Sequence, residues 1–209
     1  MSRWHFLLLV SFVVLFGAHG CSPPPQPLQS EIEFWPVSDF SLTDQNGQTV
    51  QRKDLLGKVW IASFIFTRCT TFCPQVTGTL AQLQSEFLNQ EGLLFVSISV
   101  DPEHDTPTVL KDYATKFGAD PKHWMFLTGE QDRVYQLIQE GFKDTAMQNQ
   151  GQARTPGNEV THSSRLFLID RKGKIRGYFE GRQVDDKGNN IGELPRLKQK
   201  LAELLAEQP

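Results

Sequence analysis

The sequence has 209 residues, with 21 Lys and Arg residues, 24 Asp and Glu residues and a formal net charge of -3. This length is typical of one domain with appended segments. The small net charge and the lack of a long basic run in the sequence argue against a polyanion-binding protein, so we expect no nucleic-acid partner.

The first 20 residues have the composition of a secretory signal peptide. Arg3 precedes an apolar run from Phe6 to Phe16, and small residues follow this run. The run is shorter than the roughly 20 residues that a membrane-spanning helix needs. An uncleaved membrane anchor is the alternative interpretation. The composition favours an exported protein, in a compartment where disulfides persist.

Residues 21–33 are predicted to be a tether. Gly20 and Cys21 end the stretch "AHGC", which resembles the lipidation box of bacterial lipoproteins, although Ala18 stands where leucine is usual. An ordinary signal peptide with an incidental cysteine is the alternative. The Pro-rich stretch after Cys21 predicts an extended spacer. We therefore expect a domain of residues 34–209 that is anchored to the membrane through a lipid on Cys21, on the extracytoplasmic (periplasmic) side.

From residue 34 onwards, the hydrophobic pattern predicts strands that alternate with helices. The expected elements are a hairpin around Asn46–Gly47, a buried strand at 58–66, a helix from Pro74, a strand at 93–100, a helix at 106–118, a strand at 124–129, a helix at 132–142, a loop at 143–160, a hairpin at 164–181 and an amphipathic helix at 193–208. This order predicts an α/β, thioredoxin-like fold, in which helices flank a mixed sheet.

Cys69 and Cys73 follow the first buried strand and precede Pro74, where the next helix begins. On one helix face, side chains four residues apart lie about 5–6 Å from each other, so both sulfurs can reach one point. The positive end of the helix favours thiolates, and the neighbouring Arg68 adds to this effect. The pattern indicates a redox-active disulfide or a two-sulfur metal clamp. A permanent structural disulfide is the alternative, although so short a loop gives little stabilisation.

The spacing of the two thiols separates this chain from better-known thiol proteins. Thioredoxin-type enzymes have two residues between their cysteines, whereas three lie between Cys69 and Cys73. A peroxiredoxin-like reading of Cys73 is weak, because Phe66 occupies the place of the expected proline. Two thiolates at one point suit a soft metal, above all Cu(I), whereas structural zinc is usually held by four ligands.

A third metal ligand is expected among the histidines outside the signal segment, which are His104, His123 and His162. His162 is the best candidate, because it ends the long polar loop and directly precedes a predicted strand. A loop tip beside a central strand can lie against the helix that carries the thiols. His104 lies just past another strand end and is the reserve candidate.

Three stretches together resemble the Sco/SenC family of copper proteins: "FTRCTTFCP", "SISVDPEHDTP" and "HSSRLFLIDRKG". The resemblance implies a copper site built from Cys69, Cys73 and His162. It also implies a role in loading copper into cytochrome c oxidase, or in acting on that copper centre as a thiol–disulfide reductase. Asp101 falls on a recurrent family position and is expected to hold its loop or to support the site. Thr161 stands where many members have Asp, which leaves the affinity for Cu(II) open.

Two other functions remain open from the sequence. The first is a metal-independent thiol–disulfide oxidoreductase, and the second is a copper or redox sensor. The Cys-x3-Cys spacing and a well-placed histidine favour a copper metallochaperone over the oxidoreductase. The lack of a recognisable signalling domain in the sequence favours it over the sensor.

Overall fold

The computed structural model describes residues 35–88 and 90–207. The predicted signal peptide, Cys21 and the Pro-rich tether lie outside these residues, as does residue 34, the expected start of the domain. Within the described part of the chain, no helix is both long and apolar enough to span a membrane.

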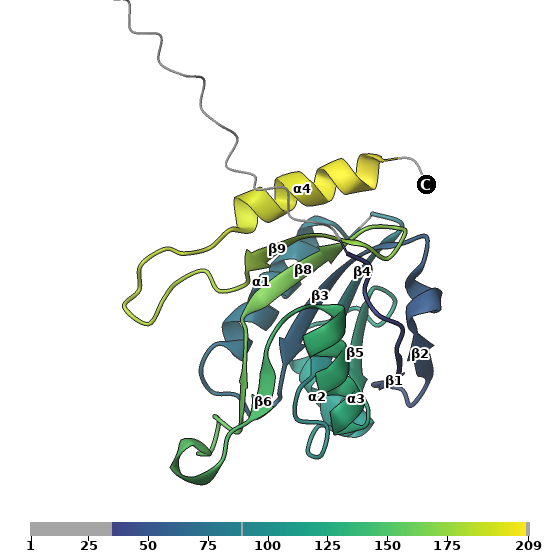
Figure 1. The fold of residues 1–209 in the computed structure, drawn as a ribbon. Helices are drawn as coiled ribbons and strands as arrows, with labels where there is room; N and C mark the ends of the chain where they lie inside the picture. The colour runs from purple at the N-terminus through teal and green to yellow at the C-terminus, as the bar shows by residue number, and fades with distance from the viewer. Residues whose placement is uncertain (1–34, 89, 208–209) are drawn as a thin grey trace, which may run out of the picture. The chain divides into compact units, whose positions relative to one another are not determined.

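Seven strands form one mixed sheet in the order β2-β1-β5-β4-β3-β8-β9 (Figure 1). β3, β4 and β5 run parallel, and the other pairings are antiparallel. Every residue of β3 is buried, as expected for a central strand covered on both faces. The strands are β1 (Ser41–Asp44), β2 (Thr49–Gln51), β3 (Val59–Ile65), β4 (Leu93–Ser99), β5 (Trp124–Thr128), β8 (Arg165–Ile169) and β9 (Ile175–Glu180).

In the described part of the chain, four α-helices accompany this sheet, and most begin and end close to where the sequence predicts. Thr106 caps α2 by accepting a hydrogen bond from the backbone N–H of Val109, and Pro74 lies in the first turn of α1. The helix expected at 132–142 is α3 followed by one π-helical segment, η2. The helices are α1 (Cys73–Glu86), α2 (Pro107–Lys116), α3 (Gln131–Gln136), η2 (Leu137–Gly141) and α4 (Leu194–Ala206), with short 3-10 turns η1 (Arg52–Leu55) and η3 (Gly151–Ala153).

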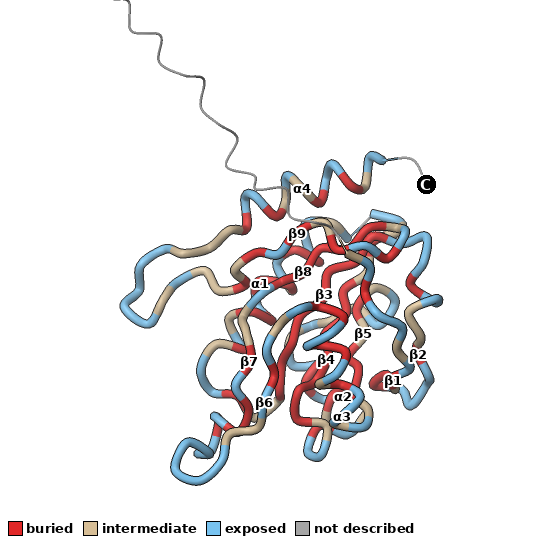
Figure 2. The backbone as a smooth tube through the Cα atoms, viewed as in Figure 1, coloured by how far each residue is buried: buried red, intermediate tan, exposed pale blue. Residues whose placement is uncertain are grey.

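The core has an aromatic cluster on each face of the sheet. On one face, the ring of Phe142, directly after η2, lies 5.1 Å from Phe64 and 5.2 Å from Phe167 between centroids. On the other face, Trp124 stacks on Phe126 at 5.1 Å. Figure 2 shows that the buried residues are concentrated in the central strands of the sheet. The predicted mixed sheet with helices on both sides is therefore confirmed.

The segment expected to be a loop at 143–160 contains a hairpin instead. β6 (Ala146–Gln148) and β7 (Val160–His162) pair only with each other, in a separate two-stranded sheet. Both strands have only three residues, which is too few to show the alternation that identifies longer strands. We call residues 146–162 the histidine hairpin, because His162 is the last residue of its second strand.

The carboxyl ends of β3 and β4 lie side by side, because the two strands are parallel and in register from Val59↔Leu93 to Ile65↔Ser99. The segments that follow these strands therefore meet at one edge of the sheet. We call residues 66–72 the cysteine loop and residues 100–106 the carboxylate loop. This edge carries the candidate site.

Candidate metal centre

The two cysteines meet, although they do not share a helix. α1 begins at Cys73, because Pro74 suits the first turn and Phe72 is the N-cap residue. Cys69 lies four residues earlier, in the cysteine loop, where its backbone N–H donates to the carbonyl of Phe66 at 3.2 Å. The expectation that both cysteines occupy one helix face is therefore wrong. Both thiols are free, buried and in contact with each other.

The surroundings of Cys69 and Cys73 shift the pKa values of the two thiols in opposite directions. A hydrogen bond from the Cys73 thiol lowers the pKa of Cys69 to about 3, against burial, with further hydrogen bonding to the Thr71 hydroxyl and to the backbone N–H of Cys73. Burial raises the pKa of Cys73, and the neighbouring Cys69 sulfur raises it further. Near neutral pH the pair therefore holds one thiolate, at Cys69, and one proton, on Cys73.

The imidazole of His162 points at these sulfurs. Its Nδ1 lies 2.9 Å from the carbonyl oxygen of Ser163, and its Nε2 lies 3.4 Å from Cys73 Sγ. A carbonyl oxygen only accepts hydrogen bonds, so Nδ1 carries the proton and the Nε2 lone pair faces the thiol. The rings of Phe66 and Phe72 flank the imidazole, with centroids 5.6 Å and 4.8 Å away. The orientation is that of a histidine prepared to bind a metal through Nε2.

The spacing of these atoms fits a metal ion of ordinary size. A sulfur and a nitrogen bound to one tetrahedral ion, at the bond lengths of zinc, lie roughly 3.6 Å apart. The observed distance between Cys73 Sγ and His162 Nε2 is 3.4 Å. No three Cys, His, Asp or Glu side chains of residues 35–88 and 90–207 are already arranged around one point as ligands. The thiols and the imidazole would therefore have to adjust to share an ion, and their soft donor set favours Cu(I).

Asp101 supports the cysteine loop through its side chain and turns the carboxylate loop through its backbone. Its Oδ2 accepts hydrogen bonds from Arg68 Nη2 at 2.6 Å and from Arg68 Nε at 3.2 Å. Its carbonyl oxygen accepts from the backbone N–H groups of His104 and Asp105. The hydrogen bond with Asp101 also raises the pKa of Arg68. Asp101 therefore holds its own loop, as expected, and it also holds Arg68, which directly precedes Cys69.

Asp105 is a second buried carboxylate that the sequence reasoning missed. Its Oδ1 accepts from the Thr67 hydroxyl at 2.5 Å, and its Oδ2 accepts from the Thr67 backbone N–H at 3.1 Å and the Ser99 hydroxyl at 2.6 Å. Burial raises the pKa of Asp105. A carboxylate shortly after a buried strand, in "SISVDPEHDTP", was the available indication. Asp105 ties the start of the cysteine loop to the end of β4.

The other two histidines lie elsewhere. His104, the reserve candidate, is exposed in the carboxylate loop. His123 lies at the amino end of β5, the opposite edge of the sheet, where its Nδ1 is 2.8 Å from Asp120 Oδ2. Of the three candidates, His162 is the one that the fold brings to the thiols.

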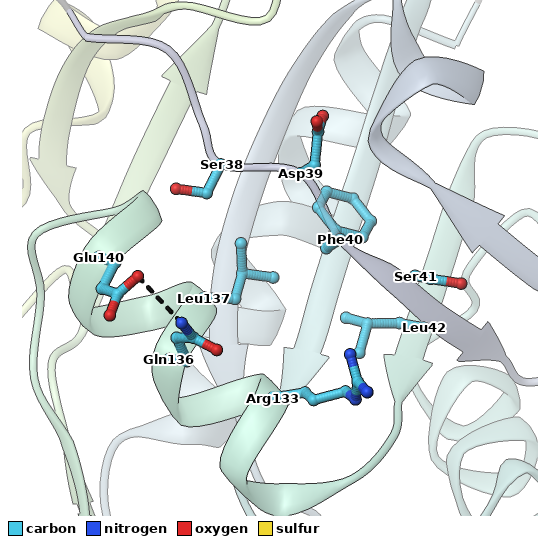
Figure 3. Close-up of a pocket in the computed structure, with 9 residues that line it drawn as sticks. All are labelled: Ser38, Asp39, Phe40, Ser41, Leu42, Arg133, Gln136, Leu137 and Glu140. Atoms are coloured by element: carbon cyan, nitrogen blue, oxygen red, sulfur yellow. Dashed lines mark hydrogen bonds between the residues drawn. The ribbon is translucent and has the colours of Figure 1, made fainter.

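A surface pocket lies apart from these residues (Figure 3). It separates the segment before β1 from α3 and η2, and Arg133 and Glu140 lie on its helical side. None of its lining residues belongs to the cysteine loop, the carboxylate loop or the histidine hairpin.

Comparisons with known proteins identify the family of this chain. The family model described as SCO1/SenC matches residues 34–194, which include both cysteines and His162. The chain belongs to the SCO1/SenC family. Among solved structures, it is similar to a SCO1/SenC family lipoprotein from Bacillus anthracis str. Ames, with 30% identity and a TM-score of 0.71 over 81% of this chain and 95% of that chain.

Two further SCO1/SenC structures extend this comparison. BsSco, described as having a disulfide switch and as a member of the Sco family of cytochrome c oxidase assembly proteins, is 28% identical, with a TM-score of 0.69 over 84% of this chain and 96% of its own. ScoI from Bradyrhizobium japonicum, solved with copper bound, is 26% identical, with a TM-score of 0.60 over 79% of this chain and 99% of its own. The expected α/β thioredoxin-like class and the family resemblance are both confirmed.

Proposed function

We propose that this SCO1/SenC protein is a copper metallochaperone that binds its cargo through Cys69, Cys73 and His162. The observation that carries the proposal is the His162 imidazole, held by Ser163 with its free Nε2 3.4 Å from Cys73 Sγ. The copper-bound ScoI relative supports the choice of metal. The description of BsSco supports cytochrome c oxidase as the client whose copper centre the protein loads or reduces.

The charges of the residues explain how the cargo is taken up. Cys69 offers a thiolate, Nε2 of His162 offers a lone pair, and Cys73 must release its proton when it becomes the second sulfur ligand. Deep burial of Cys73 favours a neutral sulfur or a metal-bound one over a free anion. Copper binding and disulfide formation then exclude each other, since both use the same sulfur lone pairs.

Copper titration of the purified protein tests this site. The reduced protein should bind one Cu(I) in competition with a chelator, and the protein with Cys69 joined to Cys73 should bind none tightly. His162→Ala should weaken Cu(I) binding and should weaken Cu(II) binding more, because Cu(II) prefers nitrogen and oxygen ligands. Equal copper binding by the oxidised form would exclude the two-thiolate site. Unchanged binding by His162→Ala would exclude the third ligand.

A thiol–disulfide reductase activity alongside copper binding is the second candidate function. The low pKa of Cys69 and the buried Cys73 thiol beside it support this activity. In such a reaction, the Cys69 thiolate attacks a substrate disulfide and releases one thiolate. Cys73 then displaces the second, so two electrons pass to the substrate and the two cysteines become joined. Reduction of a model disulfide in copper-free buffer, at a rate that His162→Ala leaves unchanged, is the expected result. A metal-independent oxidoreductase or a sensor receives no separate support from the relatives.

We further propose that the protein is exported and membrane-anchored on the extracytoplasmic side. The related Bacillus anthracis lipoprotein supports the lipidation predicted at Cys21. Cys21→Ser should release the protein from the membrane fraction and leave its thermal unfolding unchanged. A variant that stays in the membrane fraction would indicate an uncleaved anchor.

A further inference from the structure

The ligands of the proposed copper site come from two elements that are far apart in the chain. Cys69 and Cys73 flank the end of the cysteine loop, whereas His162 ends the histidine hairpin, which pairs with no strand of the large sheet. At its base, the hairpin is held by the hydroxyl of Ser163, which donates to Asp144. Strand pairing with the large sheet therefore does not hold the hairpin over the thiols, and side chains that join it to the cysteine loop help to position the imidazole.

We propose that Arg68 is a positioning residue that holds the histidine hairpin over the cysteine loop through Glu159 and thereby sets the affinity of the three-ligand site. The proposal rests on the proposed function, since it concerns the same copper site. Arg68 directly precedes Cys69, and Glu159 lies three residues before His162. One guanidinium thus joins the neighbourhoods of a sulfur ligand and the nitrogen ligand.

The guanidinium is fixed on the side of the large sheet. It donates twice to Oδ2 of Asp101, at 2.6 Å and 3.2 Å, and the Asp101 side chain is 2% exposed. The backbone N–H of Asp101 also donates to the Ser99 hydroxyl, at the end of β4. A charge-assisted pair with a buried partner is stronger than a surface pair, so the contact with Asp101 fixes the orientation of the Arg68 guanidinium.

The second carboxylate that Arg68 contacts belongs to the histidine hairpin. Arg68 Nη1 lies 3.4 Å from Oε1 of Glu159, whose side chain is 8% exposed. The second oxygen of Glu159, Oε2, is buried and has no hydrogen-bond partner among the described residues. A buried carboxylate is costly unless it is paired, and Arg68 is the cation paired with it. The positive charge of Arg68 therefore compensates the buried carboxylate of Glu159 only while the hairpin lies against Arg68.

A close backbone contact shows that the hairpin fits tightly at this point. Gly157 has φ +83°, and a Cβ atom at this position would collide with the side chain of Thr70 in the cysteine loop. Thr70 is adjacent to Cys69, so the hairpin touches the loop beside both Arg68 and the sulfur. A hairpin released from Arg68 would move its last residue, His162, relative to the thiols, while the thiols stay attached to β3 and α1.

The decisive experiment measures Cu(I) affinity of Glu159→Leu in two backgrounds, the natural chain and His162→Ala. This change removes the hairpin end of the clamp, leaves Arg68 paired with Asp101, and removes a carboxylate oxygen that lacks a partner. In the natural chain we expect about a tenfold loss of affinity, as for other residues that orient metal ligands. In His162→Ala we expect less than about a twofold loss, because the histidine through which Glu159 acts is gone.

A second variant and a control complete the design. Arg68→Met should show the same dependence on His162, and Arg68→Lys should not restore full affinity, because an ammonium cannot span both carboxylates as a guanidinium does. The control is Glu130→Leu, which removes a carboxylate from the exposed pair with Arg133 and should leave affinity unchanged. Without copper, Glu159→Leu should raise the hydrogen-exchange rate of the hairpin amides, whereas the rates of β3 should not change.

The outcomes separate this inference from the proposed function. An equal loss of affinity in both backgrounds, or no loss in the natural chain, would overturn the positioning role of Arg68 while copper binding itself stands. Unchanged hydrogen exchange in the hairpin of Glu159→Leu would also overturn it. A natural chain that binds no copper in its reduced form would overturn the proposed function and, with it, the positioning role.

Discussion

The cysteine loop and the histidine hairpin supply the same candidate site but are built differently. The cysteine loop continues the fully buried strand β3 and is held at Thr67 by the buried carboxylate of Asp105. The hairpin has two three-residue strands that pair only with each other, and its tip is exposed. The comparison teaches that the sulfur half of the site belongs to the core, whereas the nitrogen half is attached to it by side chains. Changes in the first region should therefore affect folding and thiol chemistry, and changes in the second should affect copper affinity.

The largest effect should come from Cys73→Ser, which removes the buried sulfur at the start of α1. We expect loss of both stoichiometric Cu(I) binding and disulfide formation, because the remaining thiolate has neither a second sulfur ligand nor a partner to oxidise with. Serine is similar in size, so the variant should stay folded, with a stability change of about 1 kcal/mol. Copper titration, thiol counting and circular dichroism measure these properties. If Cys73→Ser keeps the copper affinity of the natural chain, the sulfur half of the site is wrongly assigned.

The next effect concerns the anchor of the cysteine loop. Asp105→Ala removes the acceptor of three hydrogen bonds, and the partly buried Thr67 N–H keeps no substitute. We expect a loss of about 3 kcal/mol in the free energy of unfolding. Denaturant unfolding measures it, with Asp39→Ala as an exposed-carboxylate control. A loss no larger than that of the control would show that the loop is held without this carboxylate.

The variant Asp105→Asn tests the role of the Asp105 carboxyl through the pH dependence of stability. Burial raises the pKa of Asp105 above its ordinary value of 3.8, so the folded state favours the neutral acid. This contribution to stability is complete below that ordinary pKa and is lost as the pH rises through the folded pKa. The natural chain should therefore lose stability relative to Asp105→Asn as the pH rises from below 3.8. Denaturant unfolding of both proteins across this range provides the test, and the opposite slope would contradict the raised pKa.

A smaller effect is expected from Gly157→Ala in the hairpin. Its positive φ and the closeness of Thr70 both oppose a Cβ atom, and the left-handed backbone alone should cost about 1–2 kcal/mol. The hairpin should shift away from the loop, so Cu(I) affinity should fall while the rate of disulfide reduction stays the same. Gly188 also has a positive φ but has open space around it, so Gly188→Ala controls for the cost of the left-handed backbone alone. Equal copper affinities for the two variants would show that the contact with Thr70 does not matter.

The smallest effect should be that of His104→Ala. His104 lies at the same edge of the sheet as the thiols but is exposed, so we expect a stability change within about 0.5 kcal/mol and unchanged copper affinity. A Cu(I) titration beside His162→Ala checks this result. Loss of binding by His104→Ala, with binding retained by His162→Ala, would reverse the choice of the third ligand.

Local sequence patterns were enough to predict the large sheet and the positions of the two sulfurs. The apolar runs that became β3 and β4, the cap at Thr106 and the placement of Pro74 are local features, and local features can be read from neighbouring residues. Cys69 and Cys73 stand four positions apart, so their meeting needed little more than a turn before a helix. The family resemblance added His162, which spacing alone could only rank above His104.

The way in which the histidine half of the site is held depends on tertiary contacts that local patterns do not encode. Cys73 and His162 are separated by 89 positions, and no pattern of neighbouring residues encodes a contact at that distance. The hairpin was missed for the same reason, because its three-residue strands are stabilised by contacts with each other and with the cysteine loop rather than by an apolar alternation. The pairing of Arg68 with Asp101 and the contact of Asp105 with Thr67 also depend on the parallel register of β3 and β4, which brings two loops to one edge of the sheet. The pairing of Arg68 with Glu159 depends in addition on the placement of the hairpin.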